Sequence, residues 1–328
     1  METSPFFTII IPVKAINDYV RETVPHIQRL TGPTWELLIV PNETDCDEWH
    51  DPRIRIMASG RMGPAGKRDL AAKVARGEIL AFLDDDSYPE PDLLDVAANF
   101  FLDPNVVALG GPAVTPPQDT FWQRVSGATF LSRLSGGAPE RYVPVGGVRE
   151  IDDWPSVNLI VRRQAFLDIG GFNSPYWPGE DTKLCLDLIK KTGKKILYVP
   201  NMIVWHHRRA GLAGHLRQVG AYGLHRGYFA KRYPETSRRL LYFLPCGFFL
   251  FCIATLAAFW LPQPLVIVLV AGWIVYGLAL IKAWLDIRRH ESLGVSIAAL
   301  GYVVLSHGYY GARFLQGLFT RSLVSRLR

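Results

Sequence analysis

The stretch ILAFLDDDSYPEP, residues Ile79–Pro91, joins an apolar run to three consecutive carboxylates, Asp84, Asp85 and Asp86. A short apolar run that ends in turn residues is typical of a buried strand in a parallel sheet. Acids at the carboxyl end of such a strand lie where open α/β sheets bind their ligands. The stretch therefore predicts a buried strand that ends at a ligand site.

The three adjacent carboxylates allow two interpretations. They repel one another unless a cation or hydrogen-bond donors neutralise them, and Mg2+ takes one or two carboxylates together with phosphate oxygens. Acids are also favoured at the start of a helix. Taken alone, the stretch indicates either a metal–diphosphate site or an acidic helix start.

Strands and helices alternate around this stretch, connected by short loops, which predicts an α/β fold with a doubly wound parallel sheet. Other strands are expected at Phe7–Val13, Trp35–Val40, Arg53–Ala58, Val106–Gly111 and Lys195–Val199, a strand leading into a helix at 156–166, and helices at Asn17–Leu30, Lys67–Arg76, Asp92–Phe101, Asp181–Lys191 and Gly211–Lys231. Residues 115–149 are rich in glycine and proline, and we expect a long excursion over the sheet that contacts substrate.

The excess of apolar residues lies in the C-terminal third. Hydrophobic residues make up 49% of the 328, and Leu240–Ile281 contains no Asp, Glu, Lys or Arg. That length matches two membrane spans, which the turn Leu261–Pro264 divides. We expect a catalytic domain over 1–235 and a membrane region over 236–328, with helices at about 240–261 and 264–285. A buried hairpin in a soluble protein is the alternative.

Lys and Arg flank both ends of this hairpin, so the positive-inside rule predicts cytoplasmic ends, an outside turn and location in the inner membrane. The third apolar segment, 293–312, is ambiguous. If it spans, the basic tail with Arg321, Arg326 and Arg328 lies outside, against that rule. If it lies in the interface or re-enters, the tail stays cytoplasmic, and we favour this arrangement.

The charge of the chain indicates which partners to expect, and its cysteines indicate the redox state of its thiols. The net charge is +6, and basic residues gather at 190–239 and 321–328. Beside a membrane segment they indicate anionic lipid headgroups or phosphorylated substrates, and no nucleic acid. The cysteines have neither disulfide nor metal-ligand spacing, which predicts reduced thiols. They are Cys46, Cys185, Cys246 and Cys252. The run Phe6–Ile11 is too short for a signal peptide.

Four motifs occur in one order: TIIIPV, GKRDLAAKVARGEILAFLDDD, VRRQAFLDIGGF and PGED, which begin at Thr8, Gly66, Val161 and Pro178. With these motifs, residues from about 6 to 235 resemble family 2 glycosyltransferases with the GT-A fold. The membrane hairpin fits the membrane-anchored bacterial type that includes succinoglycan-type polysaccharide transferases.

The resemblance implies a nucleotide-sugar donor held with Mg2+ or Mn2+. Asp84 would contact the ribose or the metal, and Asp86 would hold the metal on the diphosphate. Asp85 points the other way if strand alternation continues, and it ranks lower as a donor contact. Lys67 and Arg68 would lie near the nucleotide, or they form an ordinary basic first turn of a helix.

The second acidic pair, Glu180 and Asp181, follows Gly179 and opens a helix, so it either caps that helix or carries chemistry. In the family the aspartate of this pair is the general base, which would take the proton of the acceptor hydroxyl. One base and one displacement give inversion. The sequence offers no pair of a nucleophile and a base that would indicate a covalent intermediate.

Further candidates have ordinary structural alternatives beside them. His206 and His207 follow a strand and would add a metal ligand, although a lone histidine is more often structural. Trp177 would stack on a sugar ring or pack in the core. Arg217 and Gln218 resemble a segment of single-addition transferases, which predicts transfer of one sugar near a lipid-phosphate acceptor.

One loop departs from the family pattern. Pro41 stands where an acid is common, so Asn42 or Glu43 would contact the base instead, with Pro12 at the end of the first strand as another donor contact. The sequence therefore predicts an inverting, metal-dependent glycosyltransferase with a lipid-linked or membrane acceptor. The alternatives are a nucleotidyltransferase, for which IPVKAIND lacks a phosphate loop, and a non-catalytic membrane scaffold, for which the altered loop is the support.

Overall fold

The computed structural model describes residues 5–44 and 48–323. Cys46, Arg326 and Arg328 lie outside these ranges, and the three described cysteines form no disulfide bond. The described residues form two compact units, one of 5–114 with 143–207 and one of 115–142 with 208–323.

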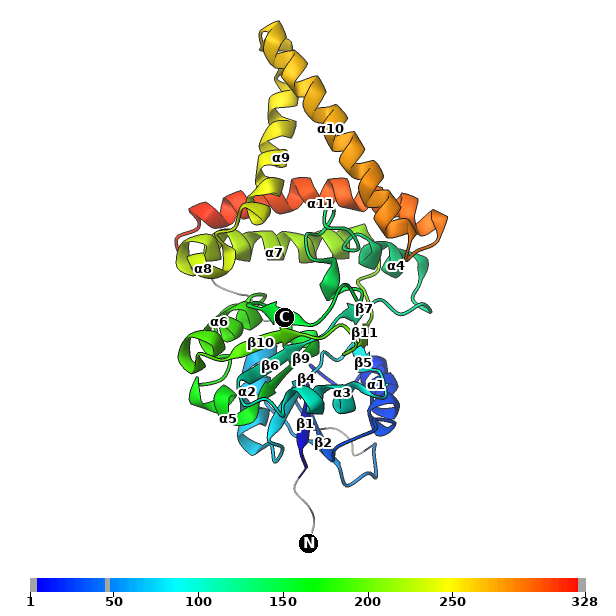
Figure 1. The fold of residues 1–328 in the computed structure, drawn as a ribbon, viewed down its shortest axis with the longest axis vertical. Helices are drawn as coiled ribbons and strands as arrows, with labels where there is room; N and C mark the ends of the chain where they lie inside the picture. Colours follow the sequence, from blue (N-terminus) through cyan, green and yellow to red (C-terminus); the bar gives the residue numbers. More distant parts are fainter. Residues whose placement is uncertain (1–4, 45–47, 324–328) are drawn as a thin grey trace. The chain divides into compact units, whose positions relative to one another are not determined.

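Eight strands form the main sheet of the first unit, in the order β3-β2-β1-β4-β9-β6-β10-β8 (Figure 1). Their bounds are β1 Phe7–Pro12, β2 Trp35–Val40, β3 Ile54–Ile56, β4 Ile79–Phe82, β6 Val106–Gly110, β8 Arg149–Ile151, β9 Leu159–Arg162 and β10 Lys195–Tyr198. Every residue of β1, β2 and β4 is buried, as expected for strands covered on both faces.

The sheet is mixed, which corrects the expectation of a parallel sheet. Strands β3, β2, β1 and β4 are parallel, but β9 runs antiparallel between β4 and β6. Leu159, the first residue of β9, pairs with the last residues of both neighbours, Phe82 and Gly110. The chain re-enters the sheet at its carboxyl edge, so β9 must run backwards.

Helices cover both faces of the sheet. α1 (Asp18–Gln28) and α3 (Leu93–Phe100) contribute to the core on one face, and α2 (Pro64–Val74), α5 (Arg163–Asp168) and α6 (Glu180–Thr192) to the core on the other. The expected helices are thus present, and α2 starts earlier than expected because Pro64 suits the first helical position.

A second, three-stranded sheet of the first unit has the order β5-β11-β7, with bounds Ser87–Pro89, Val204–His206 and Ala113–Val114. Its strand β5 follows the acids directly after β4. Antiparallel pairing of β11 with β5 sets His206 opposite Ser87. This pairing brings residues about 120 positions apart to the carboxyl end of β4.

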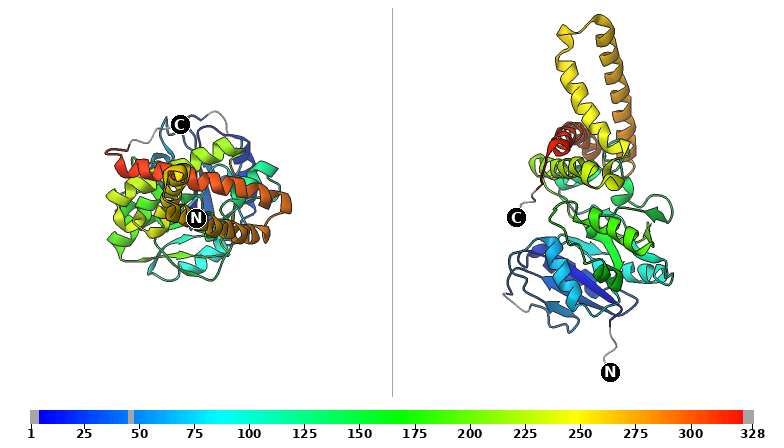
Figure 2. Two further views of the ribbon diagram at one scale, coloured as in Figure 1. Left: turned by 90° about the horizontal axis from the view of Figure 1, so that it is seen from above. Right: turned by 90° about the vertical axis from the view of Figure 1, so that its left-hand side faces the viewer.

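The second unit is helical, with α4 Phe121–Ala128, α7 Leu212–Arg232, α8 Pro234–Ser237, α9 Leu240–Leu256, α10 Gln263–Arg288 and α11 Leu293–Phe319. The expected hairpin is present as α9 and α10, which rise from the pair α7 and α11 (Figure 2). By length and composition, α10 and α11 could each cross a membrane, while α9 is shorter, with 17 residues.

The compact units do not follow the expected division into 1–235 and 236–328, and that division stays a prediction. α7 packs against α11, because glycines on α7 let the backbones approach closely. A Cβ at Gly227 would lie 2.0 Å from the Phe314 carbonyl oxygen, and one at Gly223 would lie 2.6 Å from that of Tyr310. Residues 115–142, expected over the sheet, also belong to the helical unit.

Gly227→Ala should therefore destabilise the protein by roughly 1–3 kcal/mol, because the added methyl overlaps backbone that cannot move away. Gly308→Ala is the matched control, since a Cβ there meets nothing within 4 Å and alanine favours the helix. Thermal unfolding of both variants in detergent measures the difference. Equal melting temperatures would contradict the close α7–α11 contact.

Candidate active site at the carboxyl edge of the sheet

Three consecutive residues of α2 hold three parts of the site, and Lys67 is the first. The buried Lys67 Nζ donates hydrogen bonds to the carbonyl oxygens of Val13 and Val40 and to Oδ1 of Asn42, at 2.5, 3.2 and 2.7 Å. An ammonium group has three hydrogen-bond donors, so the Lys67 side chain has all three bound to these oxygens. Burial lowers the pKa of Lys67. Lys67 therefore ties the ends of β1 and β2 together.

Arg68 is the second of these residues, and it links the two acidic motifs. Its side chain is 1% exposed, and its Nη2 lies 2.5 Å from Asp84 Oδ1. The guanidinium also lies 5.6 Å from the centre of the Phe172 ring. Both Arg68 and Asp84 act electrostatically on Glu180. The acidic motifs at Asp84 and Glu180 therefore both lie within electrostatic reach of one buried cation.

Asp69 is the third, and it was not predicted as a site residue although it stands in the GKRD motif. Its carboxylate accepts hydrogen bonds from the backbone N–H groups of Phe172 and Asn173, at 2.8 and 3.2 Å. Burial raises the pKa of Asp69, and these two hydrogen bonds oppose the rise. Asp69 thereby fixes the turn that precedes α6 and its acids.

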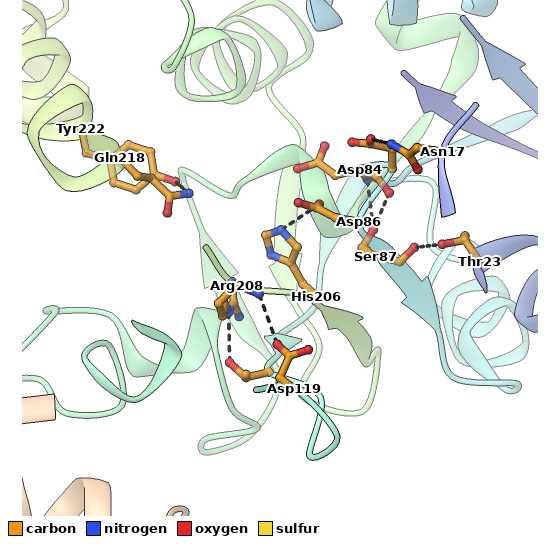
Figure 3. A network of polar contacts seen from close by, with 12 residues as sticks. Asn17, Thr23, Asp84, Asp86, Ser87, Asp119, His206, Arg208, Gln218 and Tyr222 are labelled. Atoms are coloured by element: carbon orange, nitrogen blue, oxygen red, sulfur yellow. Dashed lines mark hydrogen bonds and ion pairs between the residues drawn. The ribbon is translucent and has the colours of Figure 1, made fainter. Parts of the chain in front are cut away.

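Asp84, Asp86 and His206 form a group that could hold a metal ion. One ligand atom from each lies within 4.8 Å of the others. His206 Nε2 lies 3.1 Å from Asp86 Oδ1, and the two side chains point toward one another (Figure 3). Two carboxylates and an imidazole suit a divalent cation. Of the two histidines expected as ligands, the structure brings His206 to the acids.

His207 faces α1 instead of the metal group. Its Nε2 lies 3.2 Å from Glu22 Oε2, and its ring packs against Tyr19. Its backbone N–H donates to the Asp86 carbonyl at 3.0 Å. On the same helix, Thr23 Oγ1 donates to the Ser87 carbonyl at 2.8 Å (Figure 3). α1 thus braces the segments that carry Asp86 and His206.

Asp85 points away from the metal group and toward the start of α1. Asn17 Nδ2 donates to Asp85 Oδ2 at 2.6 Å, and Asn17 Oδ1 also caps α1 through the N–H of Val20. Burial raises the pKa of Asp85 to about 6, the Asp86 charge adds to this, and the Asn17 hydrogen bond opposes it. The expected difference between Asp85 and its neighbours is present.

Glu180 and Asp181 open α6 behind Gly179, whose φ of 112° lies in the region that favours glycine. Glu180 is buried, and Asp181 is half-buried and accepts a hydrogen bond from the Thr182 N–H at 2.8 Å. Burial raises the pKa of Glu180 to about 8, the Asp181 charge adds to this, and the Arg68 guanidinium opposes it. Burial therefore favours the protonated form of Glu180.

Two buried polar atoms of this site, Arg68 Nε and Glu180 Oε2, have no hydrogen-bond partner among the residues that the structure describes. Unpaired buried polar atoms are rare in folded proteins. Both belong to the groups that join the acidic motifs, so the site has donor and acceptor capacity left for a ligand or for water.

The remaining candidates lie in three places. Pro12 ends β1 and is buried, Asn42 is fixed by Lys67, and Glu43 is exposed. Trp177 is half-buried in the turn before α6. Arg217 and Gln218 belong to α7 in the helical unit, where Gln218 Nε2 donates to the Tyr222 hydroxyl at 3.0 Å. In the same unit, the Arg208 N–H lies 3.3 Å from Asp119 Oδ2 (Figure 3).

Residues 8–166 match the model of glycosyl transferase family 2. The chain is 26% identical over 243 residues to a pre-mycofactocin glycosyltransferase of Mycobacterium tuberculosis, which covers 71% of this chain. It is 23% identical over 202 residues to a glucosyl-dolichyl phosphate glucuronosyltransferase of Haloferax volcanii, 54% of this chain and 60% of the relative. The chain spans about half (49%) of the M. tuberculosis protein.

The fold is similar to that of a mannosyltransferase from Pyrobaculum calidifontis, solved with GDP-Man and Mn2+. The TM-score is 0.55 at 18% sequence identity, over 98% of this chain and 89% of that chain. This likeness identifies the sheet as a GT-A fold, as the sequence motifs led us to expect.

Adjacent histidines give a matched test of the metal group. His206→Gln should weaken Mn2+ binding about tenfold or more, because it removes one of three ligands. His207→Gln should leave the affinity within about twofold, since His207 faces Glu22. Mn2+ titration followed by electron paramagnetic resonance measures both. Equal effects, or a larger one at His207, would argue against the group.

The protonated state of Glu180 predicts a pH-dependent stability. The pKa of Glu180 in the folded state, about 8, is above its ordinary value of 4.5. Between these values the folded chain holds a proton that the unfolded chain has released, so stability falls as pH rises. Glu180→Gln removes this dependence. The melting temperature of the variant minus that of wild type should therefore increase from pH 5 to pH 8.

Glu43→Gln serves as the control, because Glu43 is exposed and should change nothing across this range. A difference between Glu180→Gln and wild type that stays constant with pH would show that Glu180 is ionised in the folded protein.

Proposed function

Because the chain belongs to glycosyl transferase family 2, we propose that it transfers a single sugar from a nucleotide-sugar donor to a lipid-linked acceptor, with inversion at the anomeric carbon. The observation that carries this proposal is the pairing of Asp84 with Arg68, because the same guanidinium acts on Glu180. It ties a metal-binding motif to an acidic pair at one edge of the sheet.

Asp84, Asp86 and His206 would hold a divalent cation, and their oxygen and nitrogen donors fit Mg2+ or Mn2+. When bound, such a cation neutralises charge on a leaving diphosphate. Arg68 balances the charge of Asp84, and α1 keeps Asp86 in place through the backbone of His207. The Pyrobaculum calidifontis structure, which contains GDP-Man and Mn2+, supports this assignment.

Asp181 would act as the general base, taking the proton of the acceptor hydroxyl as its oxygen attacks the anomeric carbon. Burial keeps Glu180 protonated, so it adds no second negative charge beside Asp181. A single base supports one displacement and hence inversion. Trp177, in the turn before Asp181, is the candidate for contact with a sugar ring.

The donor's nucleoside would lie at the ends of β1 and β2, near Pro12, Asn42 and Glu43. Lys67 supports this loop from behind, because all three of its donors bind the chain. We therefore assign Lys67 a positioning role and not direct contact with the diphosphate. The identity of the base would depend on Asn42 or Glu43.

The apolar hairpin supports a membrane acceptor. Leu240–Ile281 contains no charged residue, and at its tip Phe259 and Trp260 are 98% and 83% exposed. Exposed apolar surface of this kind fits a bilayer better than water. The Haloferax volcanii relative, whose name specifies a dolichyl phosphate, supports a lipid-phosphate acceptor, with Arg217 as its candidate contact. The flanking basic residues favour a cytoplasmic catalytic unit in the inner membrane.

The test is a donor screen with the full chain in lipid nanodiscs. UDP-, GDP- and dTDP-sugars are offered with Mn2+ or Mg2+ and a polyprenyl phosphate, and nucleotide release is measured. We expect release with one donor class, dependent on metal and acceptor, and a product of inverted configuration. Donor and metal binding without turnover would support a scaffold, and pyrophosphate release from a nucleoside triphosphate would support a nucleotidyltransferase.

Asp181→Asn should lower kcat by about 10²–10⁴-fold while Mn2+ affinity stays unchanged, because it removes the base but no metal ligand. Asp187→Asn is the control on the same helix, since Asp187 pairs with Lys183 on α6. Steady-state nucleotide release and Mn2+ titration separate the two effects. An Asp181→Asn enzyme with wild-type kcat would contradict the assigned base.

A further inference from the structure

Helix α11 is long enough to cross a bilayer, but its contacts with the rest of the helical unit argue against a crossing. Its 27 residues extend about 40 Å, against about 30 Å for a hydrocarbon core. One face of α11 is buried inside the protein along most of its length. The buried residues are Val295, Ser296, Ala299, Tyr302, Val303, Ser306, Gly311, Phe314 and Gly317.

Much of this buried face lies along α7, with the two helices parallel, while Gly311 lies against the backbone of Pro245 in α9 and Ser296 accepts a hydrogen bond from Trp284 of α10. A Cβ at Gly220 would lie 2.3 Å from the Tyr309 ring, and one at Gly317 would lie 2.1 Å from the Leu224 carbonyl oxygen. The residue numbers on both helices rise together, so the contact follows the helices lengthwise (Figure 1). α11 therefore cannot tilt away from α7 without losing this interface.

Polar contacts hold α11 at both ends and in the middle. Glu291, just before α11, pairs with Arg124 of α4, and Lys231 of α7 donates to the Thr320 carbonyl at 2.8 Å, just after it. Between them, the buried His215 of α7 lies 2.9 Å from Ser306 Oγ. Both ends of α11 are thus bound to charged side chains of one helical layer.

α7 itself is unsuited to the hydrocarbon core. Arg217, Arg226, Lys231 and Arg232 all lie on its 21 residues. A basic side chain at the centre of a bilayer is costly, and four on one helix exclude a span. Because α11 is packed lengthwise on α7, a spanning α11 would take these charges into the membrane or lose its partner.

The other face of α11 is apolar and exposed. Leu293, Ile297, Leu305 and Phe319 are 47–80% exposed there. The hairpin α9–α10 rises on the side of α11 that faces away from α7, in both Figure 1 and Figure 2. The hairpin and this face of α11 thus both present exposed apolar side chains in the helical unit.

We propose that α11 lies in the plane of the membrane and binds the boundary between headgroups and acyl chains, with α7 on its polar side. This inference rests on the membrane attachment proposed above. It leaves the hairpin α9–α10 as the part that enters the bilayer. Both ends of the chain then lie on the same side of the membrane.

Reporter fusions to the full chain test the number of crossings. Green fluorescent protein, active in the cytoplasm, and alkaline phosphatase, active outside it, are each fused to either end. We expect both ends to report the same side. Opposite sides would overturn the inference and leave the proposed transferase intact. Recovery of the chain in the soluble fraction, whatever its activity, would instead remove the membrane attachment and this inference with it.

Depth measurements separate an in-plane helix from a spanning or re-entrant one. Nitroxide labels are placed at positions 297, 305 and 319, with 274 on the exposed face of α10 as the deep reference. Positions 297 and 319 are about 33 Å apart along the helix axis. We expect equal, shallow depths at the three α11 positions. A depth that changes progressively between 297 and 319 would overturn the inference.

The labels need a chain in which serine replaces the four native cysteines, and its Mn2+ affinity must equal that of wild type before labelling. The reporter fusions need no substitution, so they decide the number of crossings even if the cysteine-free chain does not fold.

Discussion

The run Lys67, Arg68 and Asp69 at the start of α2 is the constraint on which the site depends. Successive side chains of a helix point in different directions, so three neighbours can hold three separate segments. Lys67 holds the ends of β1 and β2, Arg68 holds Asp84, and Asp69 holds the turn before α6. One short helix thereby sets the distance between the acidic motifs, and burial of Arg68 strengthens its pairing with the carboxylate.

Local patterns were enough to predict the first five strands of the main sheet and the acids at the end of β4, because burial and strand length leave a direct trace in the sequence. They could not predict the direction of β9, which depends on where the chain returns to the sheet. Nor could they choose between His206 and His207. That choice depends on the pairing of β11 with β5, a contact between distant segments.

Hydropathy likewise predicted the hairpin, but it could not predict how α7 and α11 pack at its base. α10 and α11 pass the same test of length and composition, yet 33% of the apolar stretch of α11 is buried inside the protein, against 6% for α10. The difference comes from glycines, such as Gly223 and Gly227, that let α7 and α11 touch along their backbones. Such contacts depend on two helices at once, so the hydropathy of either helix alone does not reveal them.

The most direct test of this account is the position of a bound metal. Crystals of the protein soaked with Mn2+ and a nucleoside diphosphate would be measured at the manganese absorption edge. We predict an anomalous peak within coordinating distance of Asp84, Asp86 and His206, with Arg68 still paired to an oxygen of Asp84 or of the ligand. A nucleotide bound without a peak there, or a peak on other residues, would contradict the account.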